Sequence, residues 1–97
     1  MKLHTKTSSF IVVDSSDLDD FIQFHYGAEY STTAMLEARN GTEEVIRVDG
    51  VLNEWDYEAL SNIATEGVMS IWPNVFLNEF ATRGLIEKGD YLIRFSW

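Results

Sequence analysis

The stretch that decides the predicted fold is TTAMLEARNGTEEVIRVD, residues 32–49, in which an Asn-Gly pair separates two short runs. Asn40-Gly41 tolerates the positive φ angles of a type I′ turn, whose twist matches that of the strands it joins. Residues 32–39 and 43–49 are therefore predicted to pair as a β-hairpin.

Two further strands are predicted on either side of this hairpin. Residues 8–13 are rich in β-branched side chains and bounded by polar residues, which is typical of a buried strand. Residues 91–97 alternate in polarity and are predicted to form the final strand. Alternation in the second hairpin strand also predicts that Ile46 and Val48 face the core.

Two helices are predicted from apolar side chains at helical spacing and from residues suited to helix ends. The first begins at Ser15 or Ser16, either of which can serve as N-cap, and ends at Gly27. The second runs from the N-cap Asn53 to Gly67. Its expected buried stripe consists of Leu52, Trp55, Ala59, Leu60, Ile63 and Ala64.

Residues 68–72 can form either a short strand or the lead into a third helix. The helical lead is preferred because Ser70 can serve as N-cap and Pro73 suits the first turn, where its missing N–H costs little. This helix is predicted to end at Gly84. Its apolar face is expected to consist of Trp72, Val75, Phe76 and Phe80. Trp72 is thus expected in the core.

Together these elements predict one small α+β domain over residues 1–97, with residues 1–7 frayed. The predicted order is β-α-β-β-α-α-β. Two to three helices should cover one face of a four-stranded, mainly antiparallel sheet whose first and last strands are central. This becomes the ferredoxin-like order if the two later helices act as one broken crossover. In the alternative architecture residues 68–72 form a fifth strand.

The composition limits the classes of function. Sixteen acidic residues against seven basic ones give a net charge of -9, which repels nucleic acid phosphate and anionic membranes but attracts basic protein surfaces. No run approaches the roughly 20 apolar residues of a membrane span, and no apolar segment follows the N-terminal lysines as it would in a signal peptide. We expect a cytoplasmic protein that binds neither nucleic acid nor membrane directly.

Residues that could carry chemistry have simpler structural interpretations. The acidic run from Asp14 to Asp20 lacks EF-hand spacing, since its sixth and twelfth positions hold Asp19 and His25 in place of glycine and glutamate. A histidine at a helix C-terminus, as His25 is predicted to be, is stabilised by the helix dipole. No glycine-rich phosphate loop or nucleophile motif is present. We therefore predict no catalytic residue, no metal site and no cofactor.

Aromatic side chains among acidic residues favour protein binding instead. Tyr57 is a candidate for exposure, and Glu54 and Glu58 lie close to it in the sequence. Trp97 has two open interpretations, of which packing at the end of the sheet is preferred to exposure. Tryptophan and tyrosine dominate the binding energy of many protein interfaces. Glu54, Tyr57, Glu58 and Trp97 are therefore the candidate interaction residues.

Three hypotheses for function remain open. The preferred one is a non-catalytic protein–protein interaction module that binds another protein or itself, because a homodimer would bury the uncovered face of the sheet. The second is a nucleic-acid mimic that inhibits a DNA- or RNA-binding enzyme; in size and acidity the chain resembles small accessory proteins of phages and other mobile elements. The third is an enzyme or small-ligand-binding protein with a pocket between sheet and helices.

Overall fold

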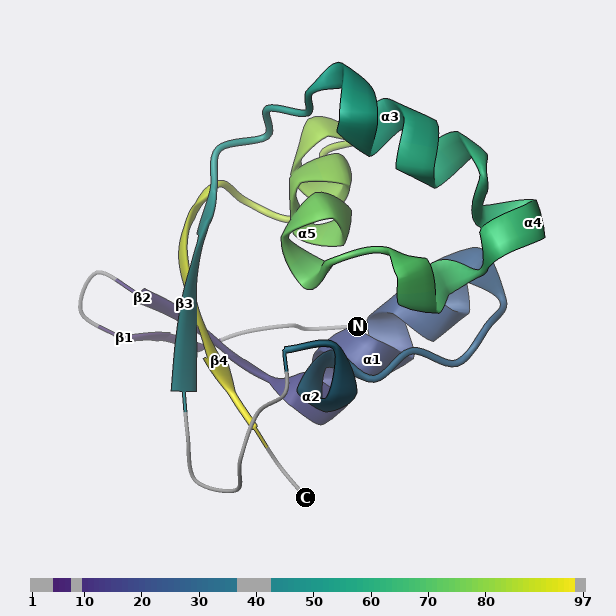
Figure 1. Cartoon of the computed structure of the whole chain (residues 1–97). Helices are drawn as coiled ribbons and strands as arrows, with labels where there is room; N and C mark the ends of the chain where they lie inside the picture. Colours follow the sequence, from purple (N-terminus) through teal and green to yellow (C-terminus); the bar gives the residue numbers. More distant parts are fainter. Residues whose placement is uncertain (1–4, 8–9, 37–42, 96–97) are drawn as a thin grey trace.

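The computed structural model describes residues 5–7, 10–36 and 43–95, and this part of the chain has an α+β fold (Figure 1). Its strands are β1 (Thr5–Thr7), β2 (Phe10–Asp14), β3 (Glu43–Val48) and β4 (Gly89–Arg94). Its helices are α1 (Ser15–Tyr26), α2 (Thr32–Met35), α3 (Glu54–Ser61), α4 (Ile63–Glu66) and α5 (Pro73–Thr82), with a 3₁₀ turn, η1 (Val68–Ser70), before α5.

The body of the sheet is a mixed arrangement of three strands, in which β4 lies between β2 and β3. β2 and β4 are parallel, with Val12 opposite Leu92, whereas β3 and β4 are antiparallel, with Val45 opposite Leu92. The three-residue β1 adds to the free edge of β2 in antiparallel orientation. The predicted four-stranded, mainly antiparallel sheet is wrong, because the body of the sheet has three strands and one of its two pairings is parallel. A parallel pairing requires a long crossover, which the helical segment between β2 and β4 supplies.

The segment predicted as the first hairpin strand begins as a helix. Thr32–Met35 forms α2, and the Asp19 carboxylate accepts hydrogen bonds from both the amide and the hydroxyl of Thr32. These bonds, together with the bond that the Ser31 hydroxyl accepts from the Ala34 amide, satisfy polar groups at the start of α2, where the threonines alone would favour a strand. β3 therefore pairs with β4 alone among the described strands. Residues 37–42, which contain the Asn40-Gly41 turn, lie outside the described residues.

The predicted element order is wrong as a consequence, and so is the ferredoxin-like arrangement derived from it. Without η1, the described order is β-β-α-α-β-α-α-α-β. The first of these strands, β1, lies in the segment predicted to be frayed, and three residues are too few to show a period. Residues 68–72 do not form the alternative fifth strand, since Val68–Ser70 is a 3₁₀ turn that leads into α5.

The helix ends agree with prediction in part, and the single helix predicted from Asn53 to Gly67 is wrong, since α3 ends at Ser61 and α4 begins at Ile63. Gly27 ends α1 with a positive φ of 71°, as expected for a glycine cap. Asp14, not a serine, occupies the N-cap position of α1, and both predicted serines follow it inside the helix. Ser70 belongs to η1, so Trp72 takes the N-cap position of α5 while Pro73 lies in its first turn as predicted.

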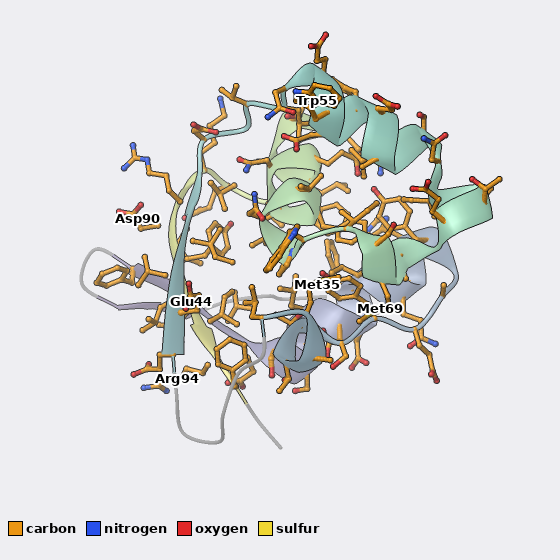
Figure 2. All side chains as sticks on the ribbon, in the orientation of Figure 1. Met35, Glu44, Trp55, Met69, Asp90 and Arg94 are labelled. Atoms are coloured by element: carbon orange, nitrogen blue, oxygen red, sulfur yellow. The ribbon has the colours of Figure 1, made fainter. Side chains whose placement is uncertain are left out.

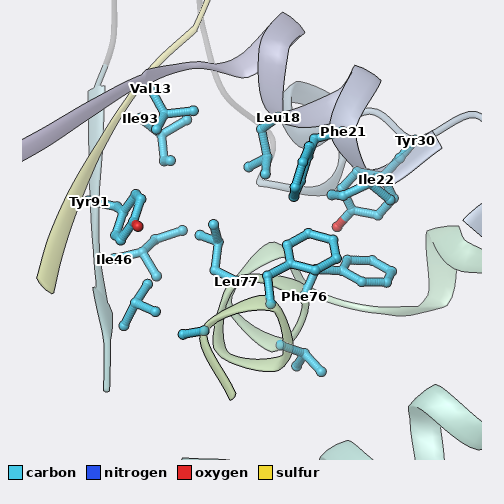
Figure 3. Close-up of a cluster of buried hydrophobic side chains, with 14 of the residues drawn as sticks. Val13, Leu18, Phe21, Ile22, Tyr30, Ile46, Phe76, Leu77, Tyr91 and Ile93 are labelled. Atoms are coloured by element: carbon cyan, nitrogen blue, oxygen red, sulfur yellow. The ribbon is translucent and has the colours of Figure 1, made fainter. Parts of the chain in front are cut away.

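The core forms where α1 and α5 pack on one face of the sheet (Figure 3). From the strands, Val13, Ile46, Tyr91 and Ile93 point toward Leu18, Phe76 and Leu77 of the helices. Ile46 and Val48 are buried, which confirms their predicted orientation. Seven of the ten residues of α5 are buried. Because burying one large apolar side chain contributes roughly 1.5–3 kcal/mol, α5 is a major source of the folding free energy.

The opposite face of the sheet carries none of the described helices (Figure 1). On this face the side chain of Val45 is 52% exposed, and those of Arg47 and Arg94 are also exposed. Within the described residues, no helix combines the length and the apolar character that crossing a membrane would require.

Candidate protein-interaction surface

The outer side of α3 exposes two large aromatic side chains. Trp55 is 71% exposed and Tyr57 is 56% exposed, and none of the eight residues of α3 is buried. The exposure of Tyr57 is as expected. The prediction that Trp55 belongs to the buried stripe is wrong, and Ala64 of that stripe is exposed as well. Figure 2 shows Trp55 on α3, well apart from Asp90 and Arg94 on the sheet.

The exposed side of α3 combines these aromatic rings with two carboxylates. At 3.6 residues per turn, Glu54 and Glu58 lie one turn apart on the same side, with Tyr57 to one side of them and Trp55 to the other. Both glutamates are exposed. We call this surface the acidic-aromatic face, defined by Glu54, Trp55, Tyr57 and Glu58. Three of these four residues are the candidates that the sequence indicated.

The N-terminus of α3 is held in place by a reciprocal pair of hydrogen bonds. The Asp56 amide donates to Oδ1 of Asn53 at 2.8 Å, and the Asn53 amide donates to Oδ2 of Asp56 at 3.2 Å. This capping box confirms Asn53 as the N-cap and satisfies backbone N–H groups that a helix start leaves free. The acidic-aromatic face therefore lies on a helix with a defined beginning.

The inner side of α3 and the segments around it anchor the helix to the core. Partly buried apolar residues in this region pack against the core cluster: Leu52, Ala59, Leu60 and Ile63. They belong to the stripe that the sequence predicted, whose remaining members are exposed. The helix is thus attached by partly buried side chains on one side, while its largest side chain, Trp55, stays 71% exposed.

No described cationic side chain neutralises the glutamates of α3. The ion pairs found among the described residues are Arg47–Asp90 at 3.5 Å, Arg83–Glu79 at 3.7 Å and Arg94–Glu43 at 3.4 Å. None involves Glu54 or Glu58. Two like charges at i and i+4 destabilise a helix by roughly 0.2–0.5 kcal/mol. A cation from another molecule would remove this repulsion.

The fourth candidate residue, Trp97, lies outside the described residues. A different tryptophan, Trp72, is 54% exposed at the start of α5, so its predicted place in the core is wrong. Helical spacing misassigned both Trp55 and Trp72, because an apolar stripe shows which side of a helix is hydrophobic but not how far the stripe extends under cover.

The acidic run of α1 has a structural role at Asp19. Its carboxylate accepts hydrogen bonds from the Thr32 amide at 2.8 Å and from the Thr32 hydroxyl at 2.6 Å, which joins α1 to α2. Burial raises the pKa of Asp19, and the two hydrogen bonds from Thr32 oppose that rise. No group of acidic or histidine side chains in the described part of the chain has metal-site geometry.

His25 is a packing residue in the structure. Its ring lies edge-on to Phe21, with centroids 4.5 Å apart, and 5.2 Å from the ring of Phe80. Nearby, the hydroxyl of Tyr26 donates to the Glu79 carboxylate, which also pairs with Arg83. Burial raises the pKa of Tyr26 far above its ordinary range, so its phenol stays a hydrogen-bond donor. Sequence reasoning missed this cluster, since 53 positions separate Tyr26 from Glu79.

No protein-family model, no curated protein and no solved structure matches this chain.

Proposed function

We propose that the protein is a non-catalytic protein-binding module whose acidic-aromatic face binds an arginine- or lysine-rich surface of a partner protein. The observation that carries this proposal is the placement, on one helix, of two carboxylates between two exposed aromatic rings, with no ion pair to any described side chain. Exposed apolar groups that lie together and are rimmed by polar residues are typical of binding surfaces.

The chemistry of the face matches a guanidinium or ammonium group. Glu54 and Glu58 can accept charge-assisted hydrogen bonds from it. Trp55 and Tyr57, on either side, offer ring faces on which a cation is attracted by the π-electron quadrupole. Arginine is the better match because it combines a planar donor group with a preference for stacking on aromatic rings.

The charge of the whole chain supports the same kind of partner. A net charge of -9 attracts basic surfaces and accelerates their association, whereas the contacts at the interface determine which partner stays bound. A nucleic-acid mimic would rely on carboxylates alone. The acidic-aromatic face favours protein recognition because half of its residues are aromatic.

The proposal can be tested with defined peptides as probes. A short arginine-glycine repeat peptide is titrated into the full chain by isothermal calorimetry, with lysine-glycine and glutamate-glycine repeats for comparison. We expect the arginine peptide to bind, the lysine peptide to bind more weakly and the glutamate peptide not to bind. Binding should weaken as salt screens the charges.

Matched variants separate recognition by this face from attraction by net charge. The double variant Glu54→Gln/Glu58→Gln and the single variant Trp55→Ala should each weaken binding of the arginine peptide by about tenfold, or about 1.4 kcal/mol. The control Asp20→Asn/Glu29→Gln removes the same charge at exposed positions outside α3 and should have a much smaller effect. Equal losses in control and test variants would show that only net charge matters and would contradict the proposal.

A further inference from the structure

The face of the sheet opposite the helices presents three rows of side chains across β2, β4 and β3. The apolar row consists of Val12, Leu92 and Val45. The first flanking row consists of Phe10, Asp90 and Arg47, and the second consists of Asp14, Arg94 and Glu43. The apolar row thus lies between two rows that each contain one arginine.

This face is better suited than the acidic-aromatic face to approach by a second copy. Its two arginines and three carboxylates sum to -1, whereas the whole chain carries -9. Two chains that meet through α3 would bring together four glutamates that form no ion pair with the described part of either chain. Two chains that meet through the open sheet face would bring together apolar side chains and paired charges, so electrostatic repulsion between the copies is weaker there than at α3.

We propose that this face binds a second copy of the chain in a two-fold symmetric, face-to-face dimer. Both copies use the same surface in such an interface: when one residue contacts a second residue of the other copy, the reverse contact also forms. The direction of the axis determines which residues meet. The two-fold axis lies between the two sheets and parallel to them. Two directions of this axis keep the strands of both copies aligned, as stacked sheets prefer. The pattern of charges distinguishes between them.

With the axis along the apolar row, the first flanking row of one copy lies over the second flanking row of the other. Asp90 then faces Arg94 of the other copy, and Arg47 faces Glu43 of the other copy. Leu92 packs on Leu92 and Val45 on Val45 across the axis. With the axis parallel to the strands, Asp90 would face Asp90 and Arg94 would face Arg94. The charges therefore select the axis along the apolar row.

The ion pairs already present within each chain support this arrangement. Arg47 lies 3.5 Å from Asp90, and Arg94 lies 3.4 Å from Glu43, with all four side chains still partly exposed. In the dimer the Arg47–Asp90 pair of one copy lies over the Arg94–Glu43 pair of the other, with each arginine above a carboxylate. Positive and negative charges therefore alternate on both sides of the apolar row. The dimer uses a different surface from the acidic-aromatic face and does not depend on the proposed function.

Sedimentation velocity over a range of micromolar concentrations tests whether the dimer exists. We expect a concentration-dependent dimer that Val45→Glu shifts at least about tenfold toward monomer. Val45 is half exposed, so this variant should fold, and circular dichroism will verify that it does. A chain that stays monomeric throughout, or an unchanged dimer of a folded Val45→Glu variant, would overturn the proposal.

Chemical crosslinking tests the orientation, and the absence of native cysteine makes every introduced thiol unique. A bismaleimide reagent that spans the roughly 10 Å between stacked sheets should crosslink Val45→Cys chains to one another. A mixture of Arg47→Cys and Glu43→Cys chains should crosslink more than either variant alone. Gln23→Cys, an exposed position on α1, serves as the control and should crosslink least. Stronger crosslinking of Arg47→Cys chains alone than of the mixture would overturn the proposed axis.

Discussion

Helices α5 and α3 are similar in length but have opposite roles in the molecule. α5 buries seven of its ten residues against the sheet and α1, whereas α3 buries none of its eight. Their aromatic side chains show the same contrast, since Phe76 and Phe80 are fully buried while Trp55 and Tyr57 are mostly exposed. The difference indicates that α5 holds the fold together and that α3 displays a surface.

The largest loss of stability is expected when a buried side chain of α5 is removed. Phe76→Ala removes a fully buried ring whose centroid lies 5.0 Å from that of the Tyr26 ring and 5.2 Å from that of the Tyr30 ring. Loss of burial and the resulting cavity should lower the free energy of unfolding by about 3–5 kcal/mol. Urea denaturation followed by circular dichroism measures this loss. A loss below about 1 kcal/mol would contradict the central role of α5.

A smaller effect is expected at Asn78, which ties α5 to the loop that leads toward α3. Its Oδ1 accepts hydrogen bonds from the amides of Asp49 at 3.0 Å and Gly50 at 2.9 Å. Asn78→Ala leaves these groups without that partner and should cost about 1–3 kcal/mol. Asn74→Ala, at an exposed position of the same helix, should change stability by less than about 0.5 kcal/mol. Equal losses in both variants would point to helix propensity as the cause.

The buried tyrosines make the stability of the fold depend on pH. Tyr91 is fully buried and donates to the Glu87 carbonyl at 2.6 Å, and burial raises its pKa from 10.0 to about 12. At a pH between these two pKa values, unfolding therefore releases a proton from Tyr91. The stability due to Tyr91 is present below pH 10 and is lost as the pH rises toward 12.

Tyr91→Phe removes both the hydrogen bond and this proton release. At neutral pH we expect a loss of about 0.5–1.5 kcal/mol. The decline in stability between about pH 8 and about pH 11 should become shallower, without vanishing, since burial also raises the pKa values of Tyr26 and Tyr30. Urea denaturation at both pH values measures the slope. A slope equal to that of the unmodified chain would contradict the assignment to Tyr91.

The smallest effect is expected on the α3 side. Trp55→Ala removes the largest side chain of α3, yet this side chain is 71% exposed and should contribute less than about 0.5 kcal/mol to stability. Urea denaturation of the Trp55→Ala and Phe76→Ala variants under the same conditions compares their losses in free energy of unfolding directly. A loss above about 2 kcal/mol would show that Trp55 packs in the core and would remove it from the acidic-aromatic face.

Local signals in the sequence predicted several features of the fold correctly. The cap at Gly27, the N-cap at Asn53 and the inward orientation of Ile46 and Val48 each depend on a few neighbouring residues, and the structure confirms them. The exposure of Tyr57 in the candidate site also follows from local spacing. Such features need no knowledge of distant parts of the chain.

Other features depend on contacts between distant residues. Thr32 at the start of α2 donates to Asp19, thirteen residues earlier, and the parallel pairing of β2 with β4 joins strands near the two ends of the chain. The exposure of Trp55 depends on how far the core extends beneath α3. Hydrophobic periodicity carries none of this information, because it describes one element at a time.

What the sequence determined by itself was the acidity, the α+β class, the helix caps at Gly27 and Asn53 and the inward face of β3, since all of these depend on composition or on neighbours within a few residues. Tertiary structure alone decided which strands pair, which apolar side chains stay exposed and which carboxylates are used internally. The physical reason is that burial and pairing are properties of the space between elements, which is defined only after the elements have packed.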